Sequence, residues 1–183
     1  MKYGRWNAET EQPILSYDPD FTDHNYKATT GIMFLFLGNQ SVYITGVADI
    51  DGNLENYNLG GFWGDLGRQC SSYGIMIQGN KTHSIVGAIH IHHFGLDGLY
   101  VGGERGNGGF YAENEYGERG LISGVESTFN ARQGVSHTGG CGITYIGCKF
   151  NNTGQGRFST APSAGADVEA ETGQTRDVLF INC

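Results

Sequence analysis

A short element, a glycine followed by an alternating apolar strand, recurs along this chain and constrains its fold more than any other feature. Its five copies begin at Gly31, Gly74, Gly98, Gly134 and Gly165. A second apolar alternation follows each copy, and the shortest full repeat is about 21 residues long. Such a short repeat cannot bury its own apolar face and is stable only when its neighbours stack on it. The repeat therefore predicts an all-β parallel solenoid of about five coils.

The alternation within each strand predicts which side chains point into the solenoid. Stacked coils align equivalent positions in columns with a spacing of about 4.8 Å. Three inward columns are expected: Ile75, Leu99, Val135 and Ala166; Ile77, Val101, His137 and Val168; and Ile91, Phe129 and Phe150. Gly and Asn are expected at the corners, where the backbone needs a positive φ. The rival fold, an antiparallel sandwich or barrel, needs a hairpin turn roughly every 8–12 residues, so the repeated strand order favours the solenoid.

The unequal spacing of the repeats predicts where loops are inserted. Extra length falls at about residues 53–72, 103–119 and 154–163, within a β-helix domain that spans residues 31–183. Residues 1–30 are expected to form an earlier coil or a loop. The sequence stops at Cys183, before the anchor of its last strand, and shows no segment to cap the open end of the stack. The chain is therefore expected to be a fragment of a longer solenoid.

Composition and charge narrow the class of partner. Gly accounts for 31 of the 183 residues, but only 3 are Pro and no strict Gly period exists, which excludes collagen. The formal net charge of −8 disfavours nucleic acid, because phosphate binding needs a basic face. No apolar run approaches the roughly 20 residues that span a bilayer. The sequence therefore predicts a partner that is neither a nucleic acid nor a membrane.

Three segments of the repeat resemble a known superfamily. Residues 91–99, 130–136 and 164–169 read IHHFGLDGL, NARQGVS and AGADVE, and they resemble the pectin-lyase-like right-handed parallel β-helix superfamily. The resemblance implies a right-handed helix, an extracellular location and a polysaccharide partner. It also implies lyase or hydrolase cleavage of a uronate-containing glycan, although the Asn-Thr-Asp, Asp-Asp, Gly-His-Gly and Arg-Ile-Lys motifs of polygalacturonases are absent. The alternative is a non-catalytic tailspike or adhesin, and a tailspike would be expected to form a trimer.

Four residues are the candidate catalytic groups. Asp167 and Glu169 are two positions apart on one predicted strand, so both face solvent with backbones roughly 6.5–7 Å apart. Two carboxylates in this arrangement could act as acid and base on a glycosidic bond or bind a Ca²⁺ that neutralises a uronate. Arg132 could pair with Asp167, hold a sugar carboxylate or abstract a proton. Asp97 precedes a glycine at a corner. This pair indicates a turn in the first place, and a catalytic acid only second. The alternative for the acidic pair is a solvated strand surface.

Five further residues are candidates for binding substrate. Tyr100 points outward from a Gly-strand, whereas Trp63 and Tyr111 lie in the inserted loops. Aromatic side chains on exposed loops suit stacking against sugars, and they equally suit packing of the loop onto the solenoid. His92 shares a strand face with His90, and His137 is expected to point inward unless the strand is irregular. His90, His92 and His93 could form a metal site or a proton-transfer site. No third ligand is marked by spacing, so solvent-facing or hydrogen-bonded histidines are expected and no metal site is predicted.

Overall fold

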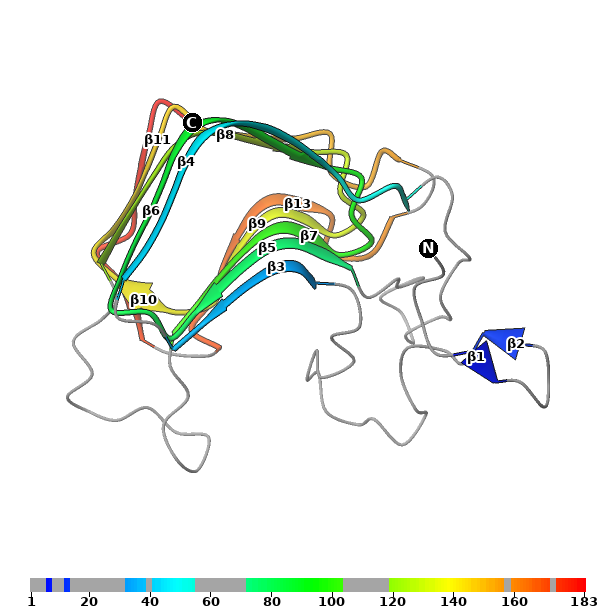
Figure 1. The fold of residues 1–183 in the computed structure, drawn as a ribbon, viewed down its shortest axis with the longest axis horizontal. Helices are drawn as coiled ribbons and strands as arrows, with labels where there is room; N and C mark the ends of the chain where they lie inside the picture. The colour runs from blue at the N-terminus through cyan, green and yellow to red at the C-terminus, as the bar shows by residue number, and fades with distance from the viewer. Residues whose placement is uncertain are drawn as a thin grey trace.

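The computed structural model describes residues 6–7, 12–13, 32–38, 41–54, 72–103, 119–156, 159–171 and 174–183. Every regular element of more than one residue in these ranges is a β-strand (Figure 1). None of the described residues belongs to a helix that is long and apolar enough to cross a membrane. The predicted all-β class is confirmed.

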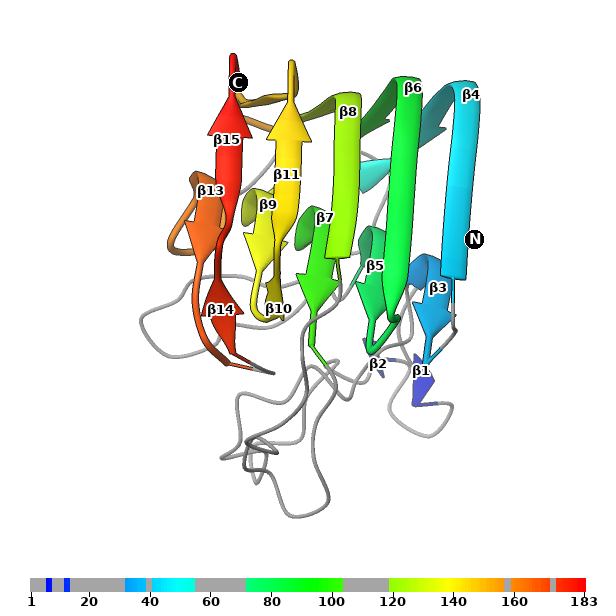
Figure 2. The same ribbon diagram turned by 90° about the vertical axis from the view of Figure 1, so that its left-hand side faces the viewer.

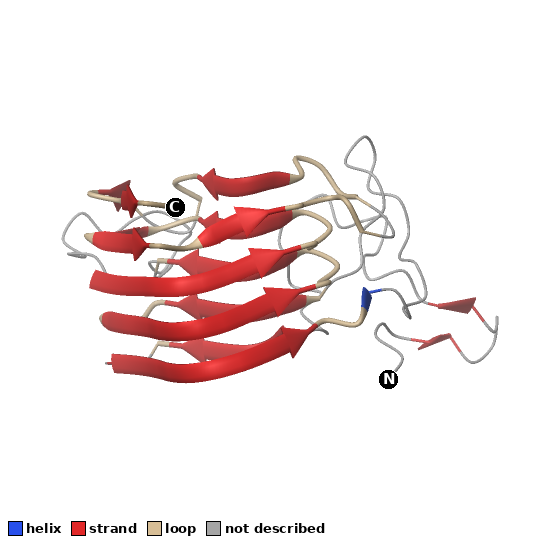
Figure 3. Ribbon diagram, turned by 90° about the horizontal axis from the view of Figure 1, so that it is seen from above, coloured by secondary structure: helices blue, strands red, loops and turns tan. Residues whose placement is uncertain are grey.

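Two parallel sheets account for most of the strands. The short sheet consists of β3 (Ile32–Leu37), β5 (Tyr73–Gln78), β7 (Asp97–Gly102), β9 (Gln133–His137) and β13 (Ala164–Val168), paired in that order. The long sheet consists of β4 (Ser41–Asp51), β6 (Thr82–His92), β8 (Arg119–Thr128), β11 (Ile143–Ile146) and β15 (Leu179–Ile181), with β12 (Lys149–Asn151) also pairing with β8. The chain alternates between the sheets, and each step moves it one strand along both (Figures 2 and 3).

Two small pairs complete the described strands. The pair formed by β10 (Gly140–Cys141) and β14 (Thr175–Arg176) is parallel, like both large sheets. The pair formed by β1 (Trp6–Asn7) and β2 (Gln12–Pro13) is antiparallel. The parallel pairing in both large sheets confirms the expected strand direction and excludes an antiparallel sandwich for this part of the chain.

The register confirms two of the three predicted columns. Ile75, Leu99, Val135 and Ala166 pair in succession across the short sheet, and so do Ile77, Val101, His137 and Val168. The third column is wrong at Phe129, because Ile91 pairs with Ser127, which in turn pairs with Phe150. Phe129 lies just beyond β8 at a φ of 53° and stacks on His93 with ring centroids 5.3 Å apart. Ser127 takes the inward position instead. The apolar pattern of the sequence does not predict this, because serine is small and polar.

The core lies between the inner faces of the two sheets. The long sheet contributes a column of Ile44, Ile85, Ile122, Tyr145 and Phe180, aligned by register. The rings of Tyr145 and Phe180 are stacked with centroids 4.5 Å apart. Two histidines are buried in the interior as well: His83 packs over Gly120, and His137 lies in a column of the short sheet. Aliphatic and aromatic ladders therefore hold the two sheets together.

The glycines that begin the repeats have a different role from the one predicted. Gly74, Gly98, Gly134 and Gly165 do not have positive φ angles. A Cβ atom at any of them would instead overlap atoms of a neighbouring strand or of the corner beside it. Glycine is needed at these positions because a side chain would overlap neighbouring backbone or side-chain atoms. The expectation that these four glycines have a positive φ is therefore wrong.

Replacing Gly98 with alanine is expected to lower the free energy of unfolding by about 1–3 kcal/mol, the usual cost of overpacking. The new methyl group would overlap Ser127 Oγ and lie 2.5 Å from Asn130 Nδ2, both buried. Chemical denaturation measures the change, with Ser84→Ala on the outer face of β6 as the control. Equal stability of Gly98→Ala and the control would contradict the close approach of β7 to this corner.

Candidate functional site

The outer face of the short sheet brings together four of the nine predicted site residues, Asp97, Tyr100, Arg132 and Asp167. Register places Tyr100, Ser136 and Asp167 side by side on neighbouring strands, as expected. Asp97 lies in register with Gln133 one strand away. We call the polar set formed by Tyr73, Asp97, Tyr100, Arg132, Gln133, Ser136 and Asp167 the Asp97 face. It is separate from the main core, since Tyr73 and Tyr100 belong to a distinct apolar cluster.

Asp97 and Arg132 form a buried ion pair at the centre of this face. Arg132 Nε donates to Asp97 Oδ1 at 2.8 Å, and Arg132 Nη2 lies 2.5 Å from Oδ2. Both side chains are almost completely buried, at 5% and 0% exposed. Burial raises the pKa of Asp97, while the charge and hydrogen bond of Arg132 oppose that shift. The predicted pairing of Arg132 with Asp167 is therefore corrected: Arg132 pairs with Asp97 on β7, on the other side of β9.

Aromatic rings surround the ion pair. The guanidinium carbon of Arg132 lies 5.9 Å from the centroid of the Tyr73 ring, within cation–π range. Tyr73 and Tyr100 meet edge to face with centroids 6.0 Å apart. The Tyr100 hydroxyl accepts a hydrogen bond from Thr138 Oγ1 at 2.8 Å. Tyr73 therefore packs against the charged pair, and Tyr100, buried on the neighbouring strand, packs against Tyr73.

The acidic pair predicted on β13 lies at the more open end of the Asp97 face. Asp167 is half-buried and accepts a hydrogen bond from Gln133 Nε2. Gln133 Oε1 has no hydrogen-bond partner among the described residues, although Gln133 itself is buried. Glu169 is exposed just beyond the strand. Asp167 and Glu169 are thus the carboxylates of the predicted set that a solute reaches most directly.

His137 does not belong to this face. Its side chain is buried in the interior, where Nδ1 lies 2.8 Å from the Tyr145 hydroxyl. Burial lowers the pKa of His137 to about 4. The expectation that His137 contacts a substrate is corrected, because the regular alternation of β9 turns the ring into the same column as Val101.

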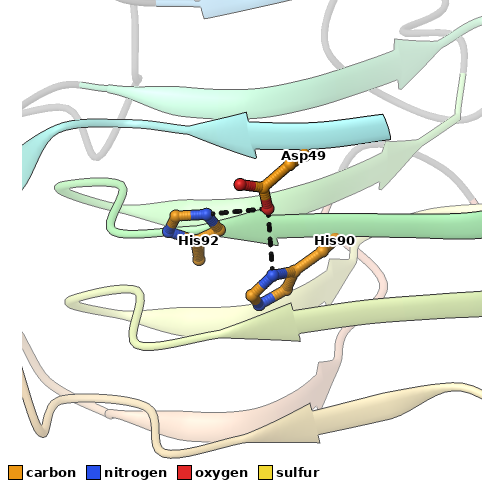
Figure 4. A group of neighbouring side chains, drawn as sticks. All are labelled: Asp49, His90 and His92. Atoms are coloured by element: carbon orange, nitrogen blue, oxygen red, sulfur yellow. Dashed lines mark hydrogen bonds and ion pairs between the residues drawn. The ribbon is translucent and has the colours of Figure 1, made fainter. Parts of the chain in front are cut away.

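His92 lies on the other sheet, beside His90 as expected and with Asp49, a partner that the sequence did not predict. On the outer face of β4 and β6, His92 Nε2 and His90 Nδ1 lie 3.0 and 3.1 Å from the same oxygen, Asp49 Oδ1 (Figure 4). Register pairs Asp49 with His90 and Asp51 with His92. The sequence carried a signal for this pairing: Asp49-Ile50-Asp51 and His90-Ile91-His92 follow Gly46 and Gly87 at equal distances.

Trp63 and Tyr111 fall outside the described residues, as do most of the first two predicted loops. Comparisons of the chain with protein-family models, with curated proteins and with solved structures found no match. The resemblance to the pectin-lyase-like superfamily therefore rests on the residues of this chain and remains a prediction.

Proposed function

We propose that the described strands of residues 32–183 wind as a right-handed parallel β-helix of five coils, and that the protein acts on an extracellular polysaccharide. Support for the fold comes from two parallel sheets whose strands alternate along the chain and advance together. Short parallel strands joined by turns at some corners and by inserted loops at others are typical of solenoids, in which each repeat is buried by its neighbours. The outer sheet faces of such a fold offer long, regular surfaces to a linear polymer.

The observation that carries the proposed function is the convergence of Asp97, Tyr100, Arg132 and Asp167 on one outer face. These residues come from three neighbouring strands of the short sheet or their corners. Sugar hydroxyl and carboxylate groups are recognised by hydrogen bonds from polar side chains. Tyr100 is buried, like Asp97 and Arg132, so the groups on this face that a sugar can reach are those of Asp167 and of Glu169 just beyond the strand. The substrate class proposed is a uronate-containing glycan.

Within this proposal the residues take different roles. Asp167 is the acid–base group, because it is accessible and Gln133 Nε2 fixes one of its oxygens. Glu169, two residues on and exposed, is the second carboxylate. Arg132 and Asp97 are positioning residues, since each occupies the hydrogen-bonding groups of the other.

A second candidate function is glycan binding without cleavage. The Asp97–Arg132 pair favours it, because a guanidinium buried against a carboxylate is not accessible to a sugar carboxylate or a reacting proton. In this alternative the β-helix belongs to a tailspike or surface adhesin.

Incubation of the full chain with polygalacturonate, alginate and hyaluronate, and with neutral dextran as the polymer control, tests both candidates. Absorbance from unsaturated uronate marks a lyase, and reducing ends without it mark a hydrolase. Each assay is run with and without Ca²⁺, because Asp167 and Glu169 offer oxygen ligands. Binding without cleavage supports the second candidate, and neither binding nor cleavage of any polymer contradicts both.

Replacing Asp167 with asparagine is expected to reduce cleavage about 10²- to 10⁴-fold, the usual contribution of a general acid or base. Glu126→Gln is the matched control, because Glu126 lies on the long sheet in an exposed ion pair with Lys149. Unchanged cleavage in Asp167→Asn would remove the catalytic role from this face.

A further inference from the structure

The geometry points to a metal site that is independent of the Asp97 face and goes beyond the proposed function. We propose that Asp49, His90 and His92 bind a divalent first-row transition metal ion of the Zn²⁺ class on the outer face of the long sheet. The three side chains come from two adjacent strands, β4 and β6, near their C-terminal ends (Figure 4).

The spacing of the donor atoms fits such an ion. Asp49 Oδ1 lies 3.1 Å from His90 Nδ1 and 3.0 Å from His92 Nε2. A tetrahedral Zn²⁺ with bonds of about 2.0–2.1 Å requires ligand atoms about 3.3 Å apart. The three donor atoms lie within 4.8 Å of one another, so small side-chain adjustments would bring them into one coordination sphere.

The cluster also has the outer contacts that orient metal-binding histidines. His90 Nε2, the nitrogen turned away from Asp49, lies 2.9 Å from Thr128 Oγ1. His92 Nδ1 lies 2.6 Å from His93 Nδ1 and 3.6 Å from Asp51 Oδ1. When His90 Nδ1 and His92 Nε2 bind the ion, each ring can donate its remaining N–H to one of these partners. These contacts are compatible with the tautomers that metal binding requires, and known zinc sites use such outer contacts to orient their histidines.

The donor set selects the class of ion. Two imidazole nitrogens and one carboxylate oxygen suit Zn²⁺, Fe²⁺, Ni²⁺ or Cu²⁺, whereas Ca²⁺ and Mg²⁺ prefer oxygen alone. Solvent reaches the cluster, because the side chain of Asp49 is 71% exposed and that of His90 is 41% exposed. Water would complete the coordination sphere and leave an exchangeable position.

Calorimetric titration of the full, chelator-treated chain with Zn²⁺ tests the proposal, and one ion per chain is expected. Asp49→Asn and His90→Gln should each weaken binding by more than the about 10- to 100-fold typical of losing an outer contact, and Thr128→Val by about that amount. Asp177→Asn is the matched control, since Asp177 is an exposed aspartate between β14 and β15. Circular dichroism without metal shows whether each variant is folded.

X-ray absorption of the Zn²⁺-loaded protein identifies the ligands directly. A shell of nitrogen and oxygen at about 2.0–2.1 Å is expected, whereas coordination by a free cysteine such as Cys183 would give a sulfur shell near about 2.3 Å. A sulfur shell overturns the proposal. Zn²⁺ binding that survives in Asp49→Asn and His90→Gln also overturns the proposal. Loss of binding in Asp51→Asn and His93→Gln instead would then place the ion on the other side of His92.

Discussion

Replacing Arg132 with methionine is expected to lower the free energy of unfolding by about 3–5 kcal/mol, the cost of breaking a buried ion pair by removing one partner. The substitution leaves the Asp97 carboxylate fully buried, without the two hydrogen bonds that Arg132 donates to it. It also removes the contact between the guanidinium and the Tyr73 ring. Urea denaturation of the variant beside the parent chain measures the loss.

The double variant Asp97→Leu with Arg132→Met is the control for this prediction. Because neither charge remains buried alone, its stability should recover most of what Arg132→Met loses. Polysaccharide binding by the double variant then separates a positioning role from a purely structural one. If the pair positions the site, affinity changes although stability is restored. If the pair is only structural, affinity stays the same. A change of less than about 1 kcal/mol in Arg132→Met would show that the pair is not desolvated as described.

Acidification from pH 7 to pH 4 is expected to destabilise the chain strongly. Burial lowers the pKa of His83 and of His137 from 6.5 to about 4. Both histidines are therefore neutral in the folded state, while their unfolded counterparts bind protons below about pH 6.5. The free energy of unfolding is therefore unaffected by these histidines above about pH 6.5. It falls as the pH drops toward 4, by about 3 kcal/mol for each histidine. Thermal melting as a function of pH measures the effect.

His83→Leu separates the histidine effect from that of other groups. The two ring nitrogens of His83 find no hydrogen-bond partner in the described part of the chain, so their removal leaves no new orphaned group. The variant should be at least as stable as the parent at pH 7 and should lose less stability between pH 7 and pH 4. The raised pKa of Asp97 acts in the opposite direction and is common to both proteins, so it cancels in the comparison. Identical pH profiles would contradict the burial of a neutral His83.

Strand alternation made part of the fold predictable from the sequence. Leu99 and Val135 could be placed inward and in register because the Gly-strand repeats with little variation. Phe129 could not be placed correctly, because the chain enters a positive-φ turn after Thr128 and the inward position falls to Ser127. Hydrophobicity alone favours the phenylalanine, whereas backbone geometry decides for the serine, whose hydroxyl donates to the Gly134 carbonyl at 2.7 Å.

The candidate sites were less predictable, because they depend on which neighbouring strand supplies a partner. Arg132 precedes β9, which lies between β7 and β13, so Asp97 and Asp167 are both one strand away. The repeat does not distinguish these two neighbours, and only the packing of the corner selects Asp97. For His90 and His92 the partner Asp49 lies on β4, and the glycine-anchored match between the two segments is the only sign of it in the sequence.

Backbone hydrogen exchange of the full chain, with and without a saturating uronate oligosaccharide, tests most directly whether the Asp97 face binds a glycan. Slower exchange on binding is expected at residues 133–138 and 164–169, which cover β9 and β13 and the residue after each. The exchange rates of amides at residues 82–90, in the long sheet, should not change. Protection confined to the long sheet, or the absence of any protection with every uronate polymer, would contradict glycan binding at the Asp97 face.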